Sequence, residues 1–442
     1  MKRLFKDYGM LLVLAGLCVL FSVLTLKEQS ADGGEAVAAM LIQVNGDFSK
    51  EDIILTVGAE NKGSGTFAET LGAKLKDDGY LASRTVVGDP RDLRLALDEI
   101  KNNGENLAAI VTTGDVVKWR VLEQLKENFP EFSGYQVLVP KSQVWPDFLK
   151  RGNLLAIVDR IVVIAIIAIG MTMVIITSGI DLSVGSLIAL AAVIATLVMK
   201  KLGGLEAEAW VVPFGFMIGI LACGALGVIN GAIVSRFRVP PFITTLALML
   251  MARGLAFMTT GGFSIYQVPK TLTWLGQGSV LGIPNTVLLL VLLYVFAHVF
   301  MTRTRMGRYI YAVGGNEEAA RLSGVPVRRV IIFVYVISAL AAGLGGCIQA
   351  SQLNTGTPTM GMMFELYVIA AVVVGGTSLA GGTGSVIGTL VGAFIIAIIQ
   401  NGMNLLGVES YTQQVVLGAV ILAAVLLDKV GSGGLFGKAN QA

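Results

Sequence analysis

Polar side chains within long apolar segments are the residues of this sequence whose chemistry is most constrained. An unpartnered polar group in hydrocarbon costs several kcal/mol, so such a residue either bonds to a neighbouring helix or lines a path for a polar solute. For any single residue, a bond between helices explains the sequence at least as well as solute contact. The candidates for a translocation pathway are Asp181, Ser183, Asn230, Gln349, Asn354, Glu365, Tyr367, Asn401 and Asn404.

The densest group of these polar residues lies in the segment TSGIDLSVGS, from Thr177 to Ser186. Asp is a favourable residue before a helix because its carboxylate accepts bonds from the first free backbone N–H groups. We therefore expect Asp181 to cap the helix that follows, with Ser183 supporting the turn. This structural role has more weight than direct contact with a solute.

Catalytic chemistry has little support in this sequence. No G-x-x-x-x-G-K-[ST] phosphate loop is present, so the chain lacks the usual means of binding ATP phosphates. The run GGTSLAGGTGSVIG at Gly375–Gly388 lacks the strand and acidic residue of a dinucleotide site. His298 is the only histidine, so no His-based metal cluster or hydrolytic triad can be assembled. We expect no catalytic residue, no metal and no cofactor on this chain.

The composition indicates a membrane protein with one soluble insertion. Hydrophobic residues make up 54% of the chain and charged residues 14%, against about 25% charged residues in a soluble domain. Between Glu28 and Arg151 lie 34 of the 63 charged residues, so the longer remainder is nearly free of charge. The net charge of +3 gives no indication of nucleic-acid binding.

Ten segments are apolar enough to be candidate transmembrane helices, which predicts an α-helical polytopic membrane protein. Leu366–Leu379 is short and ends in glycine, so it is a candidate for a broken or re-entrant helix. The predicted parts are a first transmembrane helix in 1–28, an insertion at 29–151, a transmembrane domain at 152–430 and a tail at 431–442. The ten segments are Tyr8–Leu26, Asn153–Ser178, Ser183–Met199, Trp210–Ser235, Pro241–Thr260, Pro284–Met301, Val330–Ala350, Leu366–Leu379, Ser385–Leu405 and Gln413–Leu427.

The distribution of Lys and Arg predicts that both termini face the cytoplasm. Lys2, Arg3 and Lys6 precede the first span, and counting ten crossings places the Arg-rich loops on the same side. The insertion then lies outside the cytoplasmic membrane of a bacterium. A cleaved signal peptide is the rival interpretation of the first span. Its apolar run is longer than usual for a signal peptide, and no small-x-small cleavage site closely follows it.

The insertion is predicted to be a small α/β domain. Strand patterns at Asp52–Val57, Arg84–Val87, Leu107–Thr112 and Gln136–Val139 alternate with helical patterns at Thr66–Asp78, Leu93–Lys101 and Val116–Asn128, which favours a mainly parallel sheet. The segment weakly resembles one lobe of a periplasmic sugar-binding protein. Those proteins close two lobes around the ligand, so a docking or packing module is the preferred interpretation and a sugar site the alternative.

A charged segment from Arg303 to Arg329 separates two apolar spans. It reads RTRMGRYIYAVGGNEEAARLSGVPVRR and contains an E-A-A-x-x-x-G core at Glu318–Gly324. We expect a short helix here, with Gly314, Gly315 and Gly324 allowing bends at its ends. An ordinary solvated loop with arginines on the cytoplasmic side is the alternative.

Three blocks of the sequence carry a specific resemblance. They are GMTMVIITSGIDLSVGSLIAL at Gly170–Leu190, TRMGRYIYAVGGNEEAARLSGV at Thr304–Val325 and AAVVVGGTSLAGGTGSVIG at Ala370–Gly388. Over these blocks the chain resembles the membrane permease of ribose-type monosaccharide importers in the ABC transporter superfamily. The soluble insertion departs from the family, whose typical members have a short outer loop. Tyr367 departs too, because members usually place an Asp there.

The resemblance implies a transport subunit for a monosaccharide or small polyol. It implies a second permease copy or paralogue, cytoplasmic ATPase subunits that bind ATP and Mg²⁺, and an extracytoplasmic sugar-binding protein. The exact sugar stays open. The residues that match the ATPase-coupling loop are Asn316, Glu317, Glu318, Ala319, Ala320, Arg321 and Gly324.

Two other functional classes remain as alternatives. An ion-coupled secondary transporter would place a coupling carboxylate in the membrane, for which Asp181 and Glu365 are candidates, although both lie near span ends. A signalling receptor would need a cytoplasmic output domain, and the sequence has none.

Overall fold

The chain folds into two compact units, each with its own hydrophobic core. A computed structural model describes residues 2–29, 31–132 and 134–431. One unit, Leu26–Asp147, is called the inserted unit; the other comprises Met1–Thr25 and Phe148–Ala442 and is called the membrane unit. The tail predicted at 431–442 lies outside the described residues from position 432 onward.

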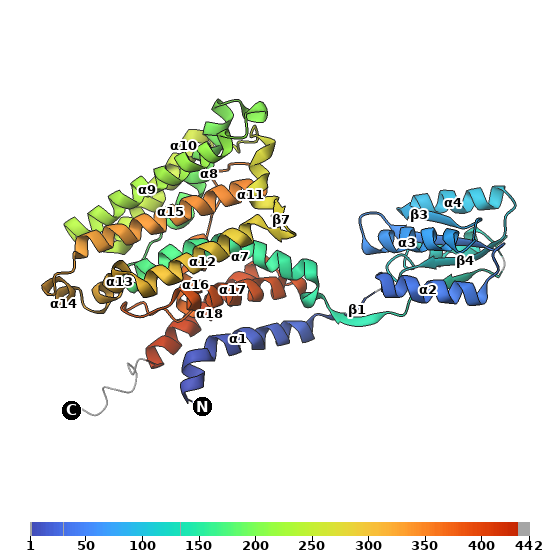
Figure 1. The fold of residues 1–442 in the computed structure, drawn as a ribbon, viewed down its shortest axis with the longest axis horizontal. Coiled ribbons are helices and arrows are strands. Elements are labelled where there is room, and N and C mark those ends of the chain that lie inside the picture. The colour runs from blue at the N-terminus through green and yellow to red at the C-terminus, as the bar shows by residue number, and fades with distance from the viewer. Residues whose placement is uncertain (1, 30, 133, 432–442) are drawn as a thin grey trace. The chain divides into compact units, whose positions relative to one another are not determined.

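Long apolar helices make up most of the membrane unit (Figure 1). Short elements connect them, among them α11 (Thr273–Gln277) and the strand pair β7 (Ser279–Val280) and β8 (Ile283–Pro284). The ten principal helices are α1 (Lys2–Leu24), α7 (Arg151–Ile176), α8 (Val184–Lys201), α9 (Val211–Phe237), α10 (Pro241–Thr260), α12 (Asn285–Arg303), α15 (Val327–Leu353), α16 (Phe364–Val374), α17 (Val386–Leu405) and α18 (Ser410–Gly431).

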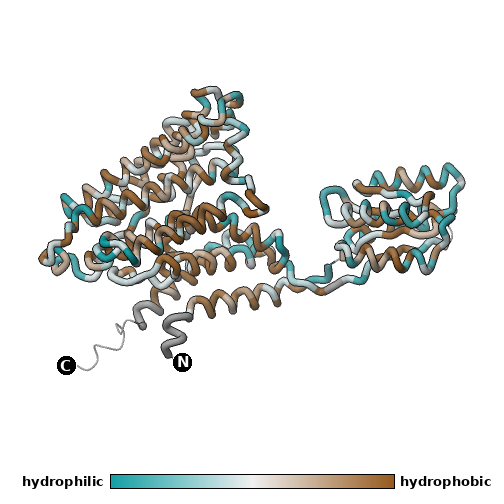
Figure 2. Tube along the Cα trace, in the orientation of Figure 1, coloured by the Kyte–Doolittle hydropathy of each residue, from teal (hydrophilic) through white to brown (hydrophobic). Residues whose placement is uncertain are grey.

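Seven helices among the described residues are long and apolar enough to cross a membrane, namely α7, α8, α9, α10, α12, α15 and α17. The other three predicted spans coincide with shorter apolar helices within α1, α16 and α18. Helix α16 has only 11 residues, in line with the short run predicted there. Figure 2 shows the hydrophobic colour extending along the helices of this unit, as expected for surfaces that face lipid or one another.

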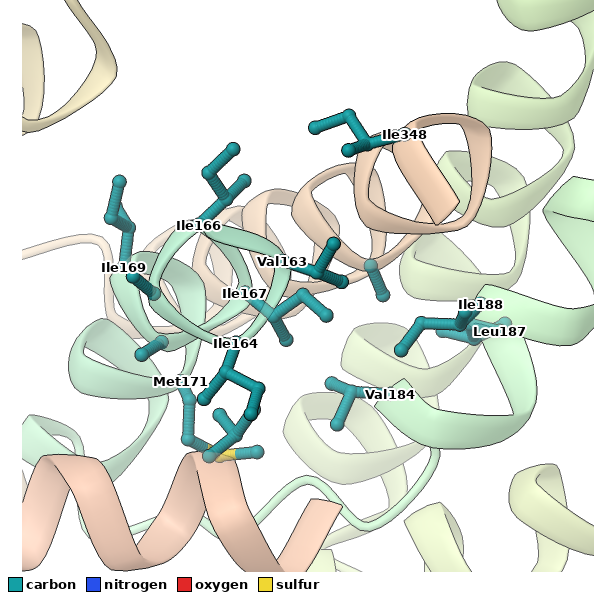
Figure 3. Close-up of a cluster of buried hydrophobic side chains, with 14 of the residues drawn as sticks. Val163, Ile164, Ile166, Ile167, Ile169, Met171, Val184, Leu187, Ile188 and Ile348 are labelled. Atoms are coloured by element: carbon teal, nitrogen blue, oxygen red, sulfur yellow. The ribbon is translucent and has the colours of Figure 1, made fainter. Parts of the chain in front are cut away.

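Helix α7 forms the centre of the membrane unit. Every residue from Ile161 to Ile176 is buried, because α7 packs against α12, α15, α16 and α17. Val163 and Ile167 of α7 and Ile188 of α8 lie in the space between these two helices (Figure 3). A helix that is apolar on all sides belongs in the interior of a bundle, and α7 holds the surrounding helices in place.

Glycines let α9 approach α15 closely. A Cβ atom on Gly227 would lie 2.8 Å from the carbonyl oxygen of Tyr335, and one on Gly231 would lie 2.7 Å from the Cα of Ile332. Small residues at helix contacts permit such packing in membranes, where apolar side chains gain little by leaving lipid.

The inserted unit contains a four-stranded parallel sheet with the order β3-β2-β4-β5. Its strands are β2 (Ile53–Ala59), β3 (Arg84–Gly88), β4 (Leu107–Thr112) and β5 (Gln136–Leu138). The helices are α2 (Gly34–Asp47), α3 (Gly63–Asp77), α4 (Pro90–Asn102), α5 (Arg120–Glu123) and α6 (Leu125–Asn128).

Alternating side chains of β2 enter two cores on opposite faces of the sheet. Leu55 and Val57 pack with Leu93 and Leu97 of α4, whereas Ile54 packs with residues of α2 and α3. This alternation follows from the two-residue period of a strand, and it explains why β2 is buried along its whole length. The mainly parallel sheet expected from the sequence is observed.

Two features of the inserted unit differ from the expectations. The single helix predicted at Val116–Asn128 is wrong: the chain forms α5 and α6, interrupted at Gln124, where φ is −102° and ψ is 17°. Leu122 of α5 and Leu125 of α6 both pack in the core. In addition, β1 (Leu26–Gln29) pairs antiparallel with β6 (Gln143–Pro146), so the unit begins and ends on one two-stranded ribbon.

Candidate functional site

The charged segment after α12 forms two helices joined by a capped turn. Helix α13 (Arg305–Gly315) begins at Thr304, whose Oγ1 accepts from the Gly307 N–H at 3.1 Å. Helix α14 (Glu317–Leu322) begins at Asn316, whose Oδ1 accepts from the Ala319 N–H at 2.9 Å. Both caps satisfy backbone donors at a helix start, which is why this polar sequence becomes helical.

Helix α14 presents most of its side chains to its surroundings. Glu318 and Arg321 form an exposed ion pair at 3.0 Å, Leu322 is 81% exposed, and only Ala320 of α14 is buried. Gly324 has φ +82° and follows the helix, as expected for a residue that ends a helix in the left-handed conformation. The residues predicted for ATPase coupling therefore lie on one short exposed element.

The end of α13 lies directly against the ends of two other segments of the membrane unit. A Cβ on Gly314 would overlap the carbonyl oxygen of Ile176, the last residue of α7, and would lie 2.7 Å from the Gly382 nitrogen. Gly382 in turn donates its N–H to the Ile176 carbonyl at 2.9 Å. The end of α13 therefore contacts α7 and the loop between α16 and α17 through backbone atoms, without an intervening side chain.

Two hydroxyl groups strengthen this junction. The Tyr311 hydroxyl donates to the Gly384 carbonyl at 2.9 Å, and burial raises the pKa of this phenol, so it remains a donor. Ser178 Oγ donates to the Ala380 carbonyl at 3.0 Å. We call the contact of Gly314 and Tyr311 with Ile176, Ser178 and residues 380–384 the coupling junction.

Asp181 is held in a buried polar cluster and does not cap α8. One carboxylate oxygen accepts from the Ser183 N–H at 3.0 Å and from Ser183 Oγ at 2.6 Å. The other accepts from Ser338 Oγ of α15 at 2.8 Å. The predicted capping role is wrong, because α8 begins at Val184 after the N-cap Ser183, and Asp181 accepts from the Ser183 N–H and not from an N–H group of α8. The carboxylate instead forms a local turn that competes with capping.

Arg253 of α10 connects the first turn of α8 with the non-helical segment that leads into α16. Its Nη1 donates to the carbonyls of Pro358 and Met360, both at 2.7 Å, and its Nη2 donates to the Gly185 carbonyl at 3.2 Å. A Cβ on Gly185 would overlap the Glu365 carboxylate and would lie 2.5 Å from the Gly361 carbonyl oxygen. The first turns of α8 and α16 thus meet at Gly185 and Glu365, beside a guanidinium.

A polar cavity of about 260 Å³ lies among α7, α16, α17 and α18. Two predicted pathway residues, Tyr367 and Asn404, line it together. Gln413 Nε2 donates to Asn404 Oδ1 and to the Val408 carbonyl, both at 2.8 Å. The residues that line the cavity are Arg160, Tyr367, Gln400, Asn404, Ser410, Gln413, Gln414 and Leu417.

The neighbouring residues Asp159 and Arg160 have separate environments. Asp159 Oδ1 accepts from Gln352 Nε2 of α15 at 3.1 Å and from Thr286 Oγ1 of α12 at 3.4 Å. Arg160 lines the polar cavity instead. Adjacent residues on a helix point about 100° apart, so one turn of α7 serves both a helix contact and a cavity.

The remaining predicted pathway residues lie apart from this cavity. Asn401 exchanges hydrogen bonds with Asn153 at 3.0 and 2.8 Å, which ties α17 to α7. Asn354 ends α15 with φ +51°. Asn230 Oδ1 and Gln349 Oε1 are buried, and neither has a hydrogen-bond partner among the described residues. The nine predicted residues are therefore distributed over several sites.

Sequence reasoning missed the two arginines at these sites. Arg253 and Arg160 each interrupt a candidate apolar span, and an ionisable residue within a span is by itself a signal of function. Gln413 and Gln414 were missed because they lie at the start of a span, where polar residues are common. The structure adds their common cavity with Tyr367.

Residues 153–425 match the protein family described as "Branched-chain amino acid transport system / permease component". The match covers more than half of the chain, and the chain therefore belongs to this family of transport permeases. The inserted unit precedes the matched residues. No solved structure matches the chain.

Curated relatives agree with this assignment. The ribose import permease of Escherichia coli is 45% identical over 292 residues, covering 65% of this chain and 88% of that protein. The ribose import permease of Bacillus subtilis is 42% identical over 287 residues, covering 64% and 87%. The D-allose transport system permease of Escherichia coli is 37% identical over 285 residues, covering 64% and 85%. The resemblance to ribose-type permeases is confirmed, and the chain is a permease subunit and not an enzyme.

Proposed function

We propose that this chain is the membrane-spanning subunit of an ATP-driven importer for a monosaccharide or a related small polyol. The observation that carries the proposal is the coupling junction, in which the short exposed helix α14 follows a helix whose end contacts α7 directly. A partner that binds α14 has a rigid route into the centre of the membrane unit. The ribose and allose permeases among the relatives support the choice of solute.

The partners follow from this role. Cytoplasmic ATPase subunits, which bind ATP and Mg²⁺, close and push on α14. An extracytoplasmic sugar-binding protein delivers the solute, and a second permease copy or paralogue completes the pathway. Both termini of this chain face the cytoplasm and the inserted unit faces outward, in agreement with the Arg-rich segment around α13 and α14.

An ion-coupled transporter has less support, because its coupling carboxylate must be free to exchange a proton or an ion. The carboxylate of Asp181 already accepts three hydrogen bonds from Ser183 and Ser338. Such bonds stabilise one charge state and favour a structural role for the group.

Reconstituted uptake tests the proposal. The full chain is incorporated into liposomes with its ATPase and binding protein, and uptake of labelled ribose, D-allose and L-arabinose is measured with and without ATP. We expect uptake to require ATP hydrolysis. Uptake that follows an ion gradient in the absence of the ATPase would contradict the proposal.

A matched pair of variants tests the role of α14. Gly324→Trp introduces a bulky side chain at a residue with φ +82° beside α14, and we expect weaker ATPase binding with normal membrane insertion. Leu281→Trp, at a 98% exposed residue before the other end of α12, is the control and should leave ATPase binding unchanged. Normal transport by Gly324→Trp would exclude α14 as the coupling element.

A further inference from the structure

The polar cavity beside α16 contains groups that neither helix packing nor the coupling junction uses. Its volume of about 260 Å³ lies below the roughly 300–1,000 Å³ of pockets for drug-sized ligands, so it suits a smaller solute. The exposed side chains of Arg160, Asn404 and Gln414 border it, so the cavity is open to a ligand.

Arg160 supplies a cation without an internal counter-charge. Among the residues that the structure describes, no carboxylate lies within ion-pair distance of its guanidinium. The neighbouring Asp159 is engaged by Gln352 and Thr286. An arginine within a span is costly, and such residues face a cavity or a partner.

The amide groups of the cavity offer both donors and acceptors. Gln413 Nε2 bonds to Asn404 Oδ1 and to the Val408 carbonyl, and within the described part of the chain no group bonds to the Asn404 amide N–H groups or to Gln413 Oε1, which leaves them for a ligand. Hydroxyl groups need such mixed partners, because each one donates and accepts. Tyr367 adds a ring with an apolar face and a polar end.

We propose that this cavity is a binding station for the transported solute, in which Arg160 donates to adjacent hydroxyl oxygens and Asn404 and Gln413 bind further hydroxyl groups. The ligand class is a neutral monosaccharide or polyol, which rests on the proposed function. Arg160 and Tyr367 are specificity-determining residues in this station. A planar guanidinium presents paired N–H donors, and two neighbouring hydroxyl oxygens match that spacing better than an isolated hydroxyl does.

Protection of a cysteine tests the station without the ATPase or the binding protein. Ser410→Cys places a thiol at the cavity wall, and the full chain is studied in nanodiscs, where both faces are accessible. Labelling of this introduced thiol by a maleimide is measured against increasing ribose, D-allose or L-arabinose. The parent chain supplies the background from Cys18, Cys223 and Cys347, of which the last two are buried.

We expect at least one sugar to protect the introduced thiol and Arg160→Gln to raise the half-protecting concentration about tenfold or more, the effect of losing a hydrogen bond to a charged group. Tyr367→Asp should raise it as well, because the new carboxylate would neutralise Arg160. Arg151→Gln on α7 and Thr412→Ala on α18 lie outside the cavity lining and should not change the half-protecting concentration. Tyr367→Phe keeps the aromatic ring and removes only the hydroxyl group. A change in its half-protecting concentration therefore reports loss of the ligand contact and not loss of folding.

Each outcome separates the station from the proposed function. If no sugar protects the introduced thiol while the same protein carries out ATP-driven sugar uptake, the station is excluded and the proposed function stands. If a sugar protects the introduced thiol but the same protein shows no ATP-driven uptake, the station is supported and the proposed coupling to the ATPase is excluded. Protection by anionic phospholipid and by none of the sugars assigns the cavity to a lipid headgroup and excludes the station.

Discussion

The guanidinium of Arg253 donates a hydrogen bond to the backbone carbonyl of Gly185 at 3.2 Å. The same guanidinium bonds to the carbonyls of Pro358 and Met360, so one side chain from α10 joins the start of α8 to the segment before α16. Backbone that leaves the helical pattern within a membrane needs such partners, because lipid supplies none. The start of α8 is therefore tied to the segment that precedes α16.

Close packing at this connection makes Gly185 intolerant of a side chain. Gly185→Ala would press a methyl group against the Glu365 carboxylate and the Gly361 carbonyl, and we expect about 1–3 kcal/mol of destabilisation together with reduced transport. Thermal unfolding of the full chain in nanodiscs and ATP-driven uptake are the measurements. Gly254→Ala on α10 is the control, since a Cβ there has no atom within 4 Å. Equal unfolding temperatures and equal uptake for the two variants would show that the contact of Gly185 with Glu365 and Gly361 tolerates an added methyl group.

Ser338 supports the buried carboxylate of Asp181. Ser338→Ala removes the 2.8 Å hydrogen bond to one carboxylate oxygen, and leaving a buried acceptor without its partner costs about 1–3 kcal/mol. We expect a lower unfolding temperature for the full chain. Thr302→Ala, at an exposed hydroxyl that bonds within its own helix, should have little effect. A Ser338→Ala protein as stable as the parent would mean that Asp181 finds another partner.

Neighbouring glycines at the coupling junction have opposite surroundings. Gly314→Ala would place its methyl group on the Ile176 carbonyl, whereas a Cβ on Gly315 has no atom within 4 Å. We expect Gly314→Ala to lower the sugar transported per ATP hydrolysed and Gly315→Ala to leave this ratio unchanged. Both ATP hydrolysis and uptake are measured in the reconstituted complex. If Gly314→Ala leaves the sugar transported per ATP hydrolysed unchanged, α13 does not transmit force from the ATPase to α7.

The chain enters and leaves the membrane unit at adjacent residues around the insertion. Phe148 N donates to Thr25 Oγ1 at 3.2 Å, and the rings of Phe21 and Phe148 stack with centroids 6.2 Å apart. We expect a chain that lacks residues 26–147, with Thr25 joined to Phe148, to elute as a monodisperse species in detergent. The same deletion with Phe148→Ala should be less stable. If the chain that lacks residues 26–147 and keeps Phe148 aggregates, the membrane unit needs the insertion to fold.

Apolar runs were sufficient to predict the long helices of the membrane unit, because a span needs about 20 apolar residues regardless of its partners. The capped helix at Glu317–Leu322 was also predictable, since Asn316 and Gly324 act locally. The partner of Asp181 was not, because Ser338 lies 157 residues away along the chain. The cavity around Arg160 likewise depends on four helices that only the tertiary packing brings together.

The antiparallel pairing of β1 with β6 has an evolutionary consequence. The pairs Leu26 with Pro146 and Gln29 with Gln143 bring the two ends of the inserted unit together, and the contact of Thr25 with Phe148 does the same for the membrane unit. A gene segment encoding such a domain can be gained or lost in one event without reversing the direction of any later helix. Such an event would leave the order and the direction of the helices of the membrane unit unchanged, so the two units can vary separately in sequence.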